Sequence, residues 1–328
     1  MPQHFISLND LTPEQFTDLL AVAAYLKQRR AQGITEHVLG GKTLAMLFEK
    51  PSLRTRMSFE VAMSELGGRS IYVRGEEVGM GTREPVRDVA RVLSRYVQGI
   101  MARVFSHQTI VDLAKFSSVP VINGLSDECH PCQALADILT IQEHFGKING
   151  LRVVFIGDAN NVARSLARAC ILIGSEMVLA CPKDYAFTAN DIAGFGSHWG
   201  TSVRQVHNPA DAVKSANVLY SDVWTSMGQE AEKAQRLKAF SGYQINDDLI
   251  AKASADVRIM HCLPAHRDEE ITDNAVEHQR AIIFDQAENR LHAQKAILRL
   301  ALANDRDAVL KAAKAQQAAN ADKATKAR

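Results

Sequence analysis

The sequence predicts an α/β protein with two doubly wound parallel-sheet domains. Short apolar runs typical of buried strands alternate with segments of helical periodicity along most of the chain. The 328 residues are enough for two separate hydrophobic cores. We expect a first domain at residues 1–145, a second at 146–290, and a polar tail at 311–328 that has little to bury and frays or extends as exposed helix.

In the first domain, apolar runs predict strands at 43–48, 70–73, 99–104 and 119–122. Helical spacing predicts helices at 8–30, from Ser52 to Leu66, at 87–96, at 110–117, and from Gln133 to Phe145. Thr12 and Pro13 are suited to the cap and the first position of a helix. The segment 75–81 is glycine-rich and polar, which favours a loop that can move.

The second domain repeats this alternation. We expect strands at 151–156, 177–180, 218–221, 258–261 and 282–284. The sharp turn at 157–161 leads into a helix at 162–173 that Gly174 ends, and a last helix follows at 291–304.

Composition excludes several classes of function. A net charge of +1 and a pI of about 7.7 give no electrostatic footprint for nucleic acid or an anionic membrane. Five cysteines without a repeating spacing argue against a disulfide framework. With no signal peptide or membrane-spanning run evident, we expect a cytoplasmic protein with a small-molecule partner.

The stretch Ser52-Leu53-Arg54-Thr55-Arg56 predicts a phosphate site. Ser52 stands where a helix N-cap belongs, so Arg54 and Arg56 fall in the first turn, where the helix dipole disfavours cations by roughly 0.3–1 kcal/mol each. Backbone N–H groups, small hydroxyls and guanidinium groups suit a tetrahedral dianion. The alternative is an ordinary capped helix whose Arg56 pairs with Glu60.

Other polar residues follow later strands, where ligands bind in open α/β sheets. Arg103 ends one strand of the first domain, and His130 and Gln133 follow another. In the second domain, Asn161, Asp222 and Ser226 suit a zwitterionic amino acid, since the carboxylate can accept from an ammonium group. Taken singly, each has a commoner reading as a surface, turn or cap residue.

Together these segments closely resemble the ornithine carbamoyltransferases. The matching segments, in family order, are Ser52-Leu53-Arg54-Thr55-Arg56, Ala102-Arg103-Val104, His130-Pro131-Cys132-Gln133, Asp222-Val223-Trp224-Thr225-Ser226-Met227-Gly228, His261-Cys262-Leu263-Pro264 and Glu288-Asn289-Arg290. The first and third are shared by carbamoyltransferases in general. The Ser-Met-Gly and His-Cys-Leu-Pro segments point to ornithine as the acceptor.

The resemblance implies a site residue by residue. Carbamoyl phosphate is expected at Ser52, Leu53, Arg54, Thr55, Arg103, His130, Gln133, Cys262, Leu263 and Arg290. L-Ornithine is expected at Asn161, Asp222, Ser226 and Met227, and catalytic roles are expected for Arg54, Arg103, His130, Asp222 and Cys262. The resemblance also implies domain closure over the substrates, a C-terminal helix at 291–310 that packs back on the first domain, and a homotrimer or a multiple of trimers. Because carbamoyl phosphate already carries a good leaving group, we expect no metal or cofactor.

Two positions depart from the family pattern. Leu53 replaces a common Thr, but this position would act mainly through its backbone N–H. Gly79 falls where many relatives carry a Gln or His that reaches the neighbouring subunit's carbamoyl phosphate, and glycine cannot supply that contact.

Alternatives stay open from the sequence. Cys129-His130-Pro131-Cys132 is a CxxC motif at a helix start, as in thiol oxidoreductases, although zinc binding would need a second pair. The turn at 157–161 lacks the GxGxxG pattern of dinucleotide sites. A non-catalytic amino-acid-binding protein and an acceptor such as putrescine or N-acylornithine are further alternatives.

Overall fold

The computed structural model describes residues 2–226 and 228–326. The chain divides into two compact units, which we call unit 1 (Met1–Leu139 with Glu288–Arg328) and unit 2 (Thr140–Ala287). Both boundaries fall inside helices, α6 (Pro131–Phe145) and α13 (Ile283–Leu302). Most of α13 and the chain after it therefore belong to the same unit as the N-terminal sheet.

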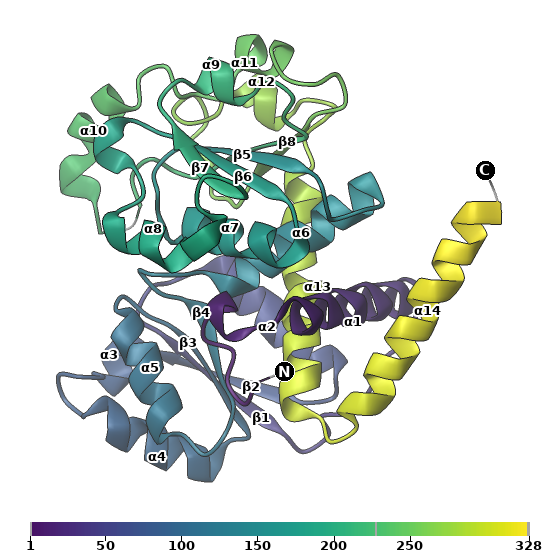
Figure 1. The fold of residues 1–328 in the computed structure, drawn as a ribbon. Helices are drawn as coiled ribbons and strands as arrows, with labels where there is room; N and C mark the ends of the chain where they lie inside the picture. The colour runs from purple at the N-terminus through teal and green to yellow at the C-terminus, as the bar shows by residue number, and fades with distance from the viewer. Residues whose placement is uncertain (1, 227, 327–328) are drawn as a thin grey trace. The chain divides into compact units, whose positions relative to one another are not determined.

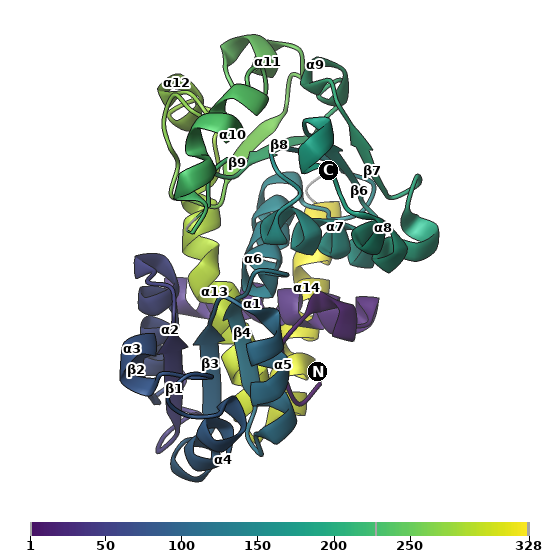
Figure 2. The same ribbon diagram turned by 90° about the vertical axis from the view of Figure 1, so that its left-hand side faces the viewer.

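Unit 1 is built on a parallel four-stranded sheet. Its strands lie in the order β2 (Arg69–Arg74), β1 (Thr43–Phe48), β3 (Gly99–Arg103), β4 (Val121–Leu125), which can be followed in Figure 2. The helices of this unit, besides the parts of α6 and α13, are α1 (Pro13–Ala31), α2 (Leu53–Glu65), α3 (Gly75–Val78), α4 (Val86–Tyr96), α5 (His107–Phe116) and α14 (Arg306–Lys326) (Figure 1). One core cluster packs β1 and β3 against α4 and α5.

Three expectations for unit 1 need correction. The predicted helix at 8–30 is a short 3-10 helix (Leu8–Asp10) followed by α1, because Thr12 starts a new helix through a capping box with Gln15. The predicted loop at 75–81 begins with the short helix α3. Strand β4 starts two residues later than expected.

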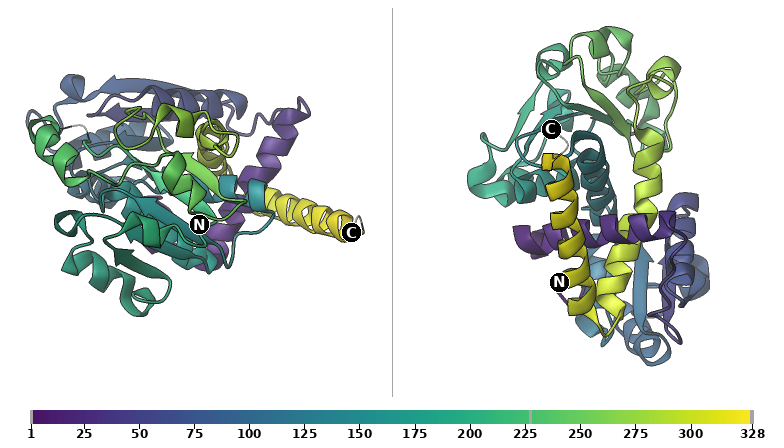
Figure 3. Two further views of the ribbon diagram at one scale, coloured as in Figure 1. Left: turned by 90° about the horizontal axis from the view of Figure 1, so that it is seen from above. Right: turned by 90° about the vertical axis from the view of Figure 1, so that its right-hand side faces the viewer.

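The C-terminal tail extends as a mostly exposed helix, which is one of its two expected forms. It forms the long helix α14, which crosses α1 (Figure 3). Ala313 is 2% exposed and Lys314 pairs with Asp18 at 2.7 Å, so the tail buries more than its composition suggests. The tail is rich in alanine and shows no hydrophobic period, so the face of α14 that packs on α1 could not be predicted from the sequence.

Unit 2 is a parallel five-stranded sheet. Its strands lie in the order β7 (Val203–Val206), β6 (Glu176–Ala180), β5 (Arg152–Ile156), β8 (Val218–Ser221), β9 (Arg258–His261). Its helices include α7 (Asn161–Ile173), α8 (Ala189–Phe195), α9 (Pro209–Ala212), α10 (Lys233–Ala239), α11 (Asp247–Ala251) and α12 (Asp273–Val276). The doubly wound fold class is confirmed in both units.

Two predictions for unit 2 are wrong. Strand β7 was not predicted, because Val203-Arg204-Gln205-Val206 has polar residues at its centre. The segment 282–284 is no strand: Ile282 makes one backbone bond to Ile259, and α13 begins at Ile283. No helix in the described ranges combines the length and apolar character needed to cross a bilayer.

Strand order locates the place in each unit where a ligand is expected to bind. In an open parallel sheet, the crevice lies at the carboxyl ends of the two strands where the winding reverses. These are β1 and β3 in unit 1, and β5 and β8 in unit 2. The residues at or just after the ends of these four strands include Ser52, Arg103, Asn160 and Asp222.

Candidate functional site

The turn after β1 is a capped helix start in unit 1. Ser52 is extended, and its hydroxyl accepts a hydrogen bond from the Thr55 backbone N–H at 3.3 Å. Helix α2 therefore begins at Leu53, whose side chain is 73% exposed. The N-cap predicted from the sequence is confirmed, and Leu53 can offer a site only its backbone.

The two arginines of this turn have different surroundings. Arg56 pairs with Glu60 at 2.9 Å and lies over the ring of Tyr72 at 4.1 Å, so its charge is balanced as the alternative reading predicted. Arg54 is half-buried, and within the described residues no hydrogen bond or ion pair joins its guanidinium to another side chain. Only Arg54 keeps an unbalanced cation at the positive end of α2.

Thr55 is the centre of a cationic cluster. Its buried hydroxyl oxygen lies 3.2 Å from Ser52 Oγ, 3.5 Å from Arg103 Nη1 and 3.2 Å from Arg290 Nη2. Two guanidinium groups thus converge on one neutral oxygen. They come from β3 and α13, which lie far apart in the sequence. Such a cluster is suited to the oxygens of a phosphate.

Gln133 holds one of these arginines in place. Its amide oxygen accepts from Arg290 Nη1 at 2.7 Å, and its amide nitrogen donates to Asp137 at 2.8 Å. Gln133, on the first turn of α6, therefore orients Arg290. The resemblance had placed a direct ligand contact at Gln133. These bonds fit a positioning role.

His130 lies buried beside the same cluster. Burial lowers the pKa of His130 well below 6.5, and the charges of Arg290 and Arg103 lower it further. A neutral imidazole can still donate one N–H hydrogen bond to a ligand oxygen.

This shift in the pKa of His130 gives a prediction for stability. The unfolded chain takes up a proton at His130 near pH 6.5, whereas the folded protein does not, so the unfolded state binds more protons and stability falls as the pH drops below about 6.5. We expect His130→Gln to weaken this loss between pH 7 and pH 5, measured by urea unfolding. A partly exposed histidine in unit 2, His198, supplies the control: His198→Gln should keep the steep dependence, and an unchanged slope in His130→Gln would contradict the assignment.

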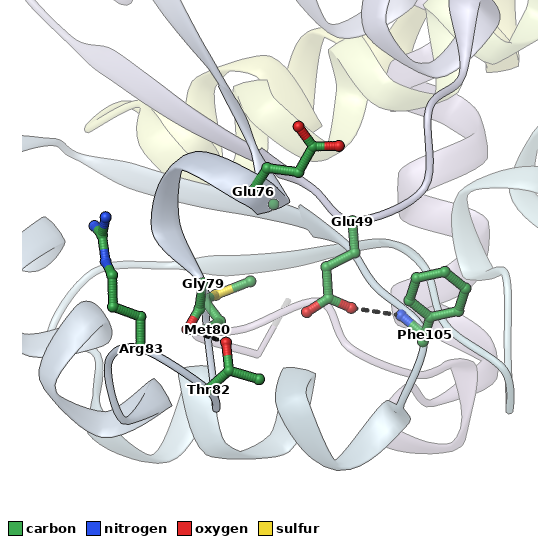
Figure 4. A pocket seen from close by; sticks show the side chains of 8 residues that line it. Glu49, Glu76, Gly79, Met80, Thr82, Arg83 and Phe105 are labelled. Atoms are coloured by element: carbon green, nitrogen blue, oxygen red, sulfur yellow. Dashed lines mark hydrogen bonds between the residues drawn. The ribbon is translucent and has the colours of Figure 1, made fainter.

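A pocket of about 490 Å³ in unit 1 lies beside this turn but does not suit an anion. Figure 4 shows its lining, which contains the carboxylates of Glu49 and Glu76 and a single cation, Arg83. Glu49 accepts a hydrogen bond from the Phe105 backbone N–H at 2.8 Å. Because two carboxylates would repel a dianion, this pocket is less suited to a phosphate than the Thr55 cluster.

The structure accounts for Gly79 in this pocket. Gly79 ends α3 with φ of 61°, a left-handed conformation that favours glycine. A Cβ atom at this position would lie 2.8 Å from the Arg83 Cβ. A Gln or His at position 79 would therefore be strained in this loop.

In unit 2, three polar side chains meet after the central strands. Asp222 follows β8, and its carboxylate accepts from Asn160 Nδ2 at 2.8 Å and from the Cys262 thiol at 2.9 Å. The Val223 backbone N–H also donates to Asp222, at 2.8 Å. A carboxylate held in this way next to a thiol can accept a proton or bind an ammonium group.

Sequence reasoning missed Asn160. It chose Asn161, the first residue of α7, but Asn160 is the helix cap, and its side chain reaches Asp222 as well as the N–H groups of Val162 and Ala163. The position of Asn160 directly before an apolar helical pattern was the signal that could have identified it.

The remaining predicted residues of unit 2 lie in turns. Ser226 is in a turn held by Gln229, through bonds of 3.1 and 3.0 Å, and Met227 lies outside the described residues. Leu263 follows Cys262 with a φ of 56° and precedes a cis proline. Its backbone N–H donates to His261 Nδ1 at 2.9 Å, which fixes the turn that presents Cys262.

The thiols argue against redox chemistry at the CxxC motif. None of the five cysteines is in a disulfide. Cys129 and Cys132 are buried, and burial raises the pKa of each to about 12, whereas catalytic cysteines in such motifs have lowered pKa values.

Thiol labelling of the native protein tests this difference. At pH 8, a thiol with a pKa of about 12 is ionised to only about one part in 10,000, and Cys262 is the one partly exposed cysteine. We expect Ellman's reagent to label one thiol per chain rapidly, and Cys262→Ala to abolish that phase, whereas the unfolded chain should show five thiols. Rapid loss of two thiols that survives Cys262→Ala would favour the oxidoreductase reading.

Comparison with known proteins agrees with both units. Residues 3–143 match the model of the aspartate/ornithine carbamoyltransferase carbamoyl-P binding domain, and residues 149–301 match that of the Asp/Orn binding domain. An ornithine carbamoyltransferase from Archaeoglobus fulgidus is 50% identical over 296 residues, which cover 90% of this chain and 96% of the relative.

Solved structures give the same result. The ornithine carbamoyltransferase from Pyrococcus furiosus superposes with a TM-score of 0.87 at 48% identity, over 91% of this chain and 96% of its own. An acetylornithine transcarbamylase complexed with acetylcitrulline gives a TM-score of 0.82 at 30% identity, over 92% and 99% of the two chains. Since both domain models match in order along most of its length, the chain belongs to the aspartate/ornithine carbamoyltransferase family.

Proposed function

We propose that this protein transfers the carbamoyl group of carbamoyl phosphate to the side-chain amine of L-ornithine and forms L-citrulline and phosphate. The observation that carries the proposal is the convergence of Ser52, Arg103 and Arg290 on the Thr55 hydroxyl, beside the unbalanced Arg54. The relatives named ornithine carbamoyltransferase, at about half identity, support the choice of acceptor.

In this scheme, unit 1 holds the donor. The phosphate group lies at the start of α2 and receives hydrogen bonds from Ser52, Thr55, Arg54 and the free N–H groups of the helix. Arg103 and neutral His130 donate to the carbonyl oxygen, on which negative charge grows as the reaction proceeds. Arg290, oriented by Gln133, completes the cationic shell.

Unit 2 supplies the groups that bind and deprotonate the acceptor. The side-chain amine of ornithine has a pKa near that of lysine, about 10.4, so it arrives as an ammonium and must lose a proton before it can attack. We assign Asp222, with Asn160 and Cys262 bound to it, to the binding and deprotonation of this group. By family resemblance, we assign the remainder of the substrates to Asn161 at the start of α7, to Ser226 and Leu263 in their turns, and to Met227.

The chemical step then needs no further reactant. The nitrogen lone pair attacks the carbonyl carbon, a C–N bond forms, and the C–O bond to the phosphate breaks. The phosphate departs with the bonding electrons, and the second nitrogen proton passes to the Asp222 and Cys262 pair or to the phosphate. The protein contributes position, charge stabilisation and proton acceptance.

The acceptor is tested by comparing three amines. We expect product formation from carbamoyl phosphate with L-ornithine, and at least a tenfold lower kcat/KM with putrescine or N-acetylornithine, because each lacks a charged group of the amino-acid head. The acetylornithine relative at 30% identity makes the third amine an informative competitor. Failure with ornithine and activity with either other amine would replace the proposed acceptor.

We also propose a homotrimer in the cytoplasm. The support for assembly is a group of apolar side chains on neighbouring elements of unit 1: Leu53 and Met57 of α2 and Ile71 of β2 are 73%, 48% and 53% exposed. Sedimentation equilibrium should give three chains per particle, and Met57→Lys should lower that number. A monomeric parent protein would contradict the trimer.

A further inference from the structure

Three side chains outside the proposed reaction converge in unit 2. His266, Glu269 and Glu270 lie in the segment between β9 and α12, a few residues after the Cys262 turn. A nitrogen of the imidazole and an oxygen of each carboxylate lie within 4.8 Å of one another. Convergence of a histidine and two carboxylates is not itself a binding site. Whether the cluster can bind a ligand depends on the hydrogen-bond partners that each atom already has.

Glu270 is fully buried, and in the part of the chain that the structure describes only one of its two carboxylate oxygens accepts hydrogen bonds. Its Oε1 accepts from His261 Nε2 at 3.0 Å and from the His266 backbone N–H at 2.7 Å. Its Oε2 is also buried, and no group in residues 2–226 or 228–326 donates to it. Leaving a buried polar atom without a partner destabilises a fold, and a charged group does so more than a neutral one.

The unpartnered oxygen of Glu270 faces two more unpartnered atoms. His266 Nδ1 lies 4.0 Å from Glu270 Oε2 and 3.5 Å from Glu269 Oε2. All three atoms are buried and none has a hydrogen-bond partner in the described part of the chain. These separations exceed a hydrogen bond. Ligand atoms about 2.0–2.2 Å from a tetrahedral ion lie roughly 3.3–3.6 Å apart, so the atoms need only a small closure to share an ion.

We propose that His266, Glu269 and Glu270 bind a divalent transition-metal ion of the zinc class. One imidazole nitrogen and two carboxylate oxygens leave a fourth position for water. The imidazole favours zinc, cobalt or nickel over magnesium and calcium, which take oxygen ligands. The second carboxylate oxygens are held from outside: Lys233 pairs with Glu269 Oε1 at 2.7 Å, and His261 donates to Glu270 Oε1.

The site is tied to the turn that carries Cys262. The Leu263 backbone N–H donates to His261 Nδ1 at 2.9 Å, so His261 carries its proton on Nε2 and donates it to Glu270. The chain of bonds therefore runs from the ion through Glu270 and His261 to the residue after Cys262. A bound ion would hold this turn in place and take no part in carbamoyl transfer.

Cobalt titration tests the site, since tetrahedral Co²⁺ reports its ligands by absorption. The full-length protein carries Cys262→Ser, so that its partly exposed thiol cannot bind the metal, and is stripped with chelator before titration. We expect one Co²⁺ per chain with visible d–d bands and no thiolate charge-transfer band. His266→Gln or Glu269→Gln in this background should weaken binding by at least roughly tenfold, the lower end of what loss of even an outer partner costs. Asp256→Asn, which removes an exposed carboxylate of the same unit, should leave binding unchanged.

Two results would overturn the proposal. One is the absence of stoichiometric d–d bands, which would mean that His266 and the two carboxylates interact only with one another. The other is binding that is equal in the parent and in His266→Gln. Thermal unfolding gives an independent reading: Zn²⁺ should raise the Tm of the parent and of Asp256→Asn but not that of His266→Gln. Both substituted side chains are partly exposed, so the variants should fold.

Discussion

Replacing Arg54 with glutamine should lower kcat/KM for carbamoyl phosphate by about 100- to 1000-fold, the usual cost of removing one donor that stabilises developing charge. Arg54 is the cation at the start of α2 that has no carboxylate partner among the described residues. Glutamine keeps most of the length and two N–H donors but removes the charge. Initial rates of citrulline formation at varied carbamoyl phosphate would measure the loss.

Arg56 is the matched control for this substitution. It lies two residues along the same helix turn, but Glu60 balances its charge and Tyr72 covers its guanidinium. Arg56→Gln should therefore change kcat/KM by less than about tenfold, since an exposed ion pair contributes only about 0–1 kcal/mol. Equal losses in the two variants would mean that the turn requires net positive charge and that Arg54 has no special place in it.

The second large effect is expected at Asp222. Asp222→Asn should lower kcat/KM for ornithine on the order of 100-fold, because a hydrogen bond with a charged partner contributes about 1.5–3 kcal/mol. The amide would also place an NH₂ group where one oxygen now accepts a hydrogen bond, either Oδ2 from Asn160 or Oδ1 from Cys262. Rates measured at saturating carbamoyl phosphate and varied ornithine would show the loss on the acceptor side.

Two further variants separate charge from proton transfer at this position. Cys262→Ser keeps a donor toward Asp222 but replaces the thiol, so a shifted pH profile of kcat would assign the thiol a part in proton transfer. Asp211→Asn removes an exposed carboxylate of the same unit that pairs with Lys214, and it should leave both constants unchanged. If Asp222→Asn kept full activity with ornithine, the carboxylate would have no role in acceptor binding.

Much of the fold could be predicted from sequence because its strands are short apolar runs separated by clear helix signals. Strand β1 and the N-cap Ser52 agree with their predictions. Strand β7 escaped because it lies at the sheet edge and is only partly buried beyond Val203, so its pattern is not apolar. The first residues of α13 looked like a strand because Ile282 and Ile283 are both buried, and a short apolar run fits either structure.

The site was predicted only in part, because it depends on contacts between distant residues and not on local strand and helix signals. Motifs placed Arg103, Arg290 and Thr55 in one group, but only the folded chain shows that two guanidinium groups converge on one hydroxyl. The unequal surroundings of Arg54 and Arg56 also depend on Glu60 and Tyr72, of which only the first lies at a helical spacing visible in the sequence. Contacts between residues far apart in the chain carry no local signal.

The central claim, carbamoyl transfer to the side-chain nitrogen of ornithine, is tested most directly by isotope labelling. The protein is mixed with ¹³C-carbamoyl phosphate and ornithine labelled with ¹⁵N at the side-chain amine, and the products are observed by ¹³C NMR. The account predicts a product whose ureido carbon is split by one-bond coupling to ¹⁵N. A ¹³C signal that appears only in hydrolysis products, or a carbamoyl carbon without that coupling, would contradict it.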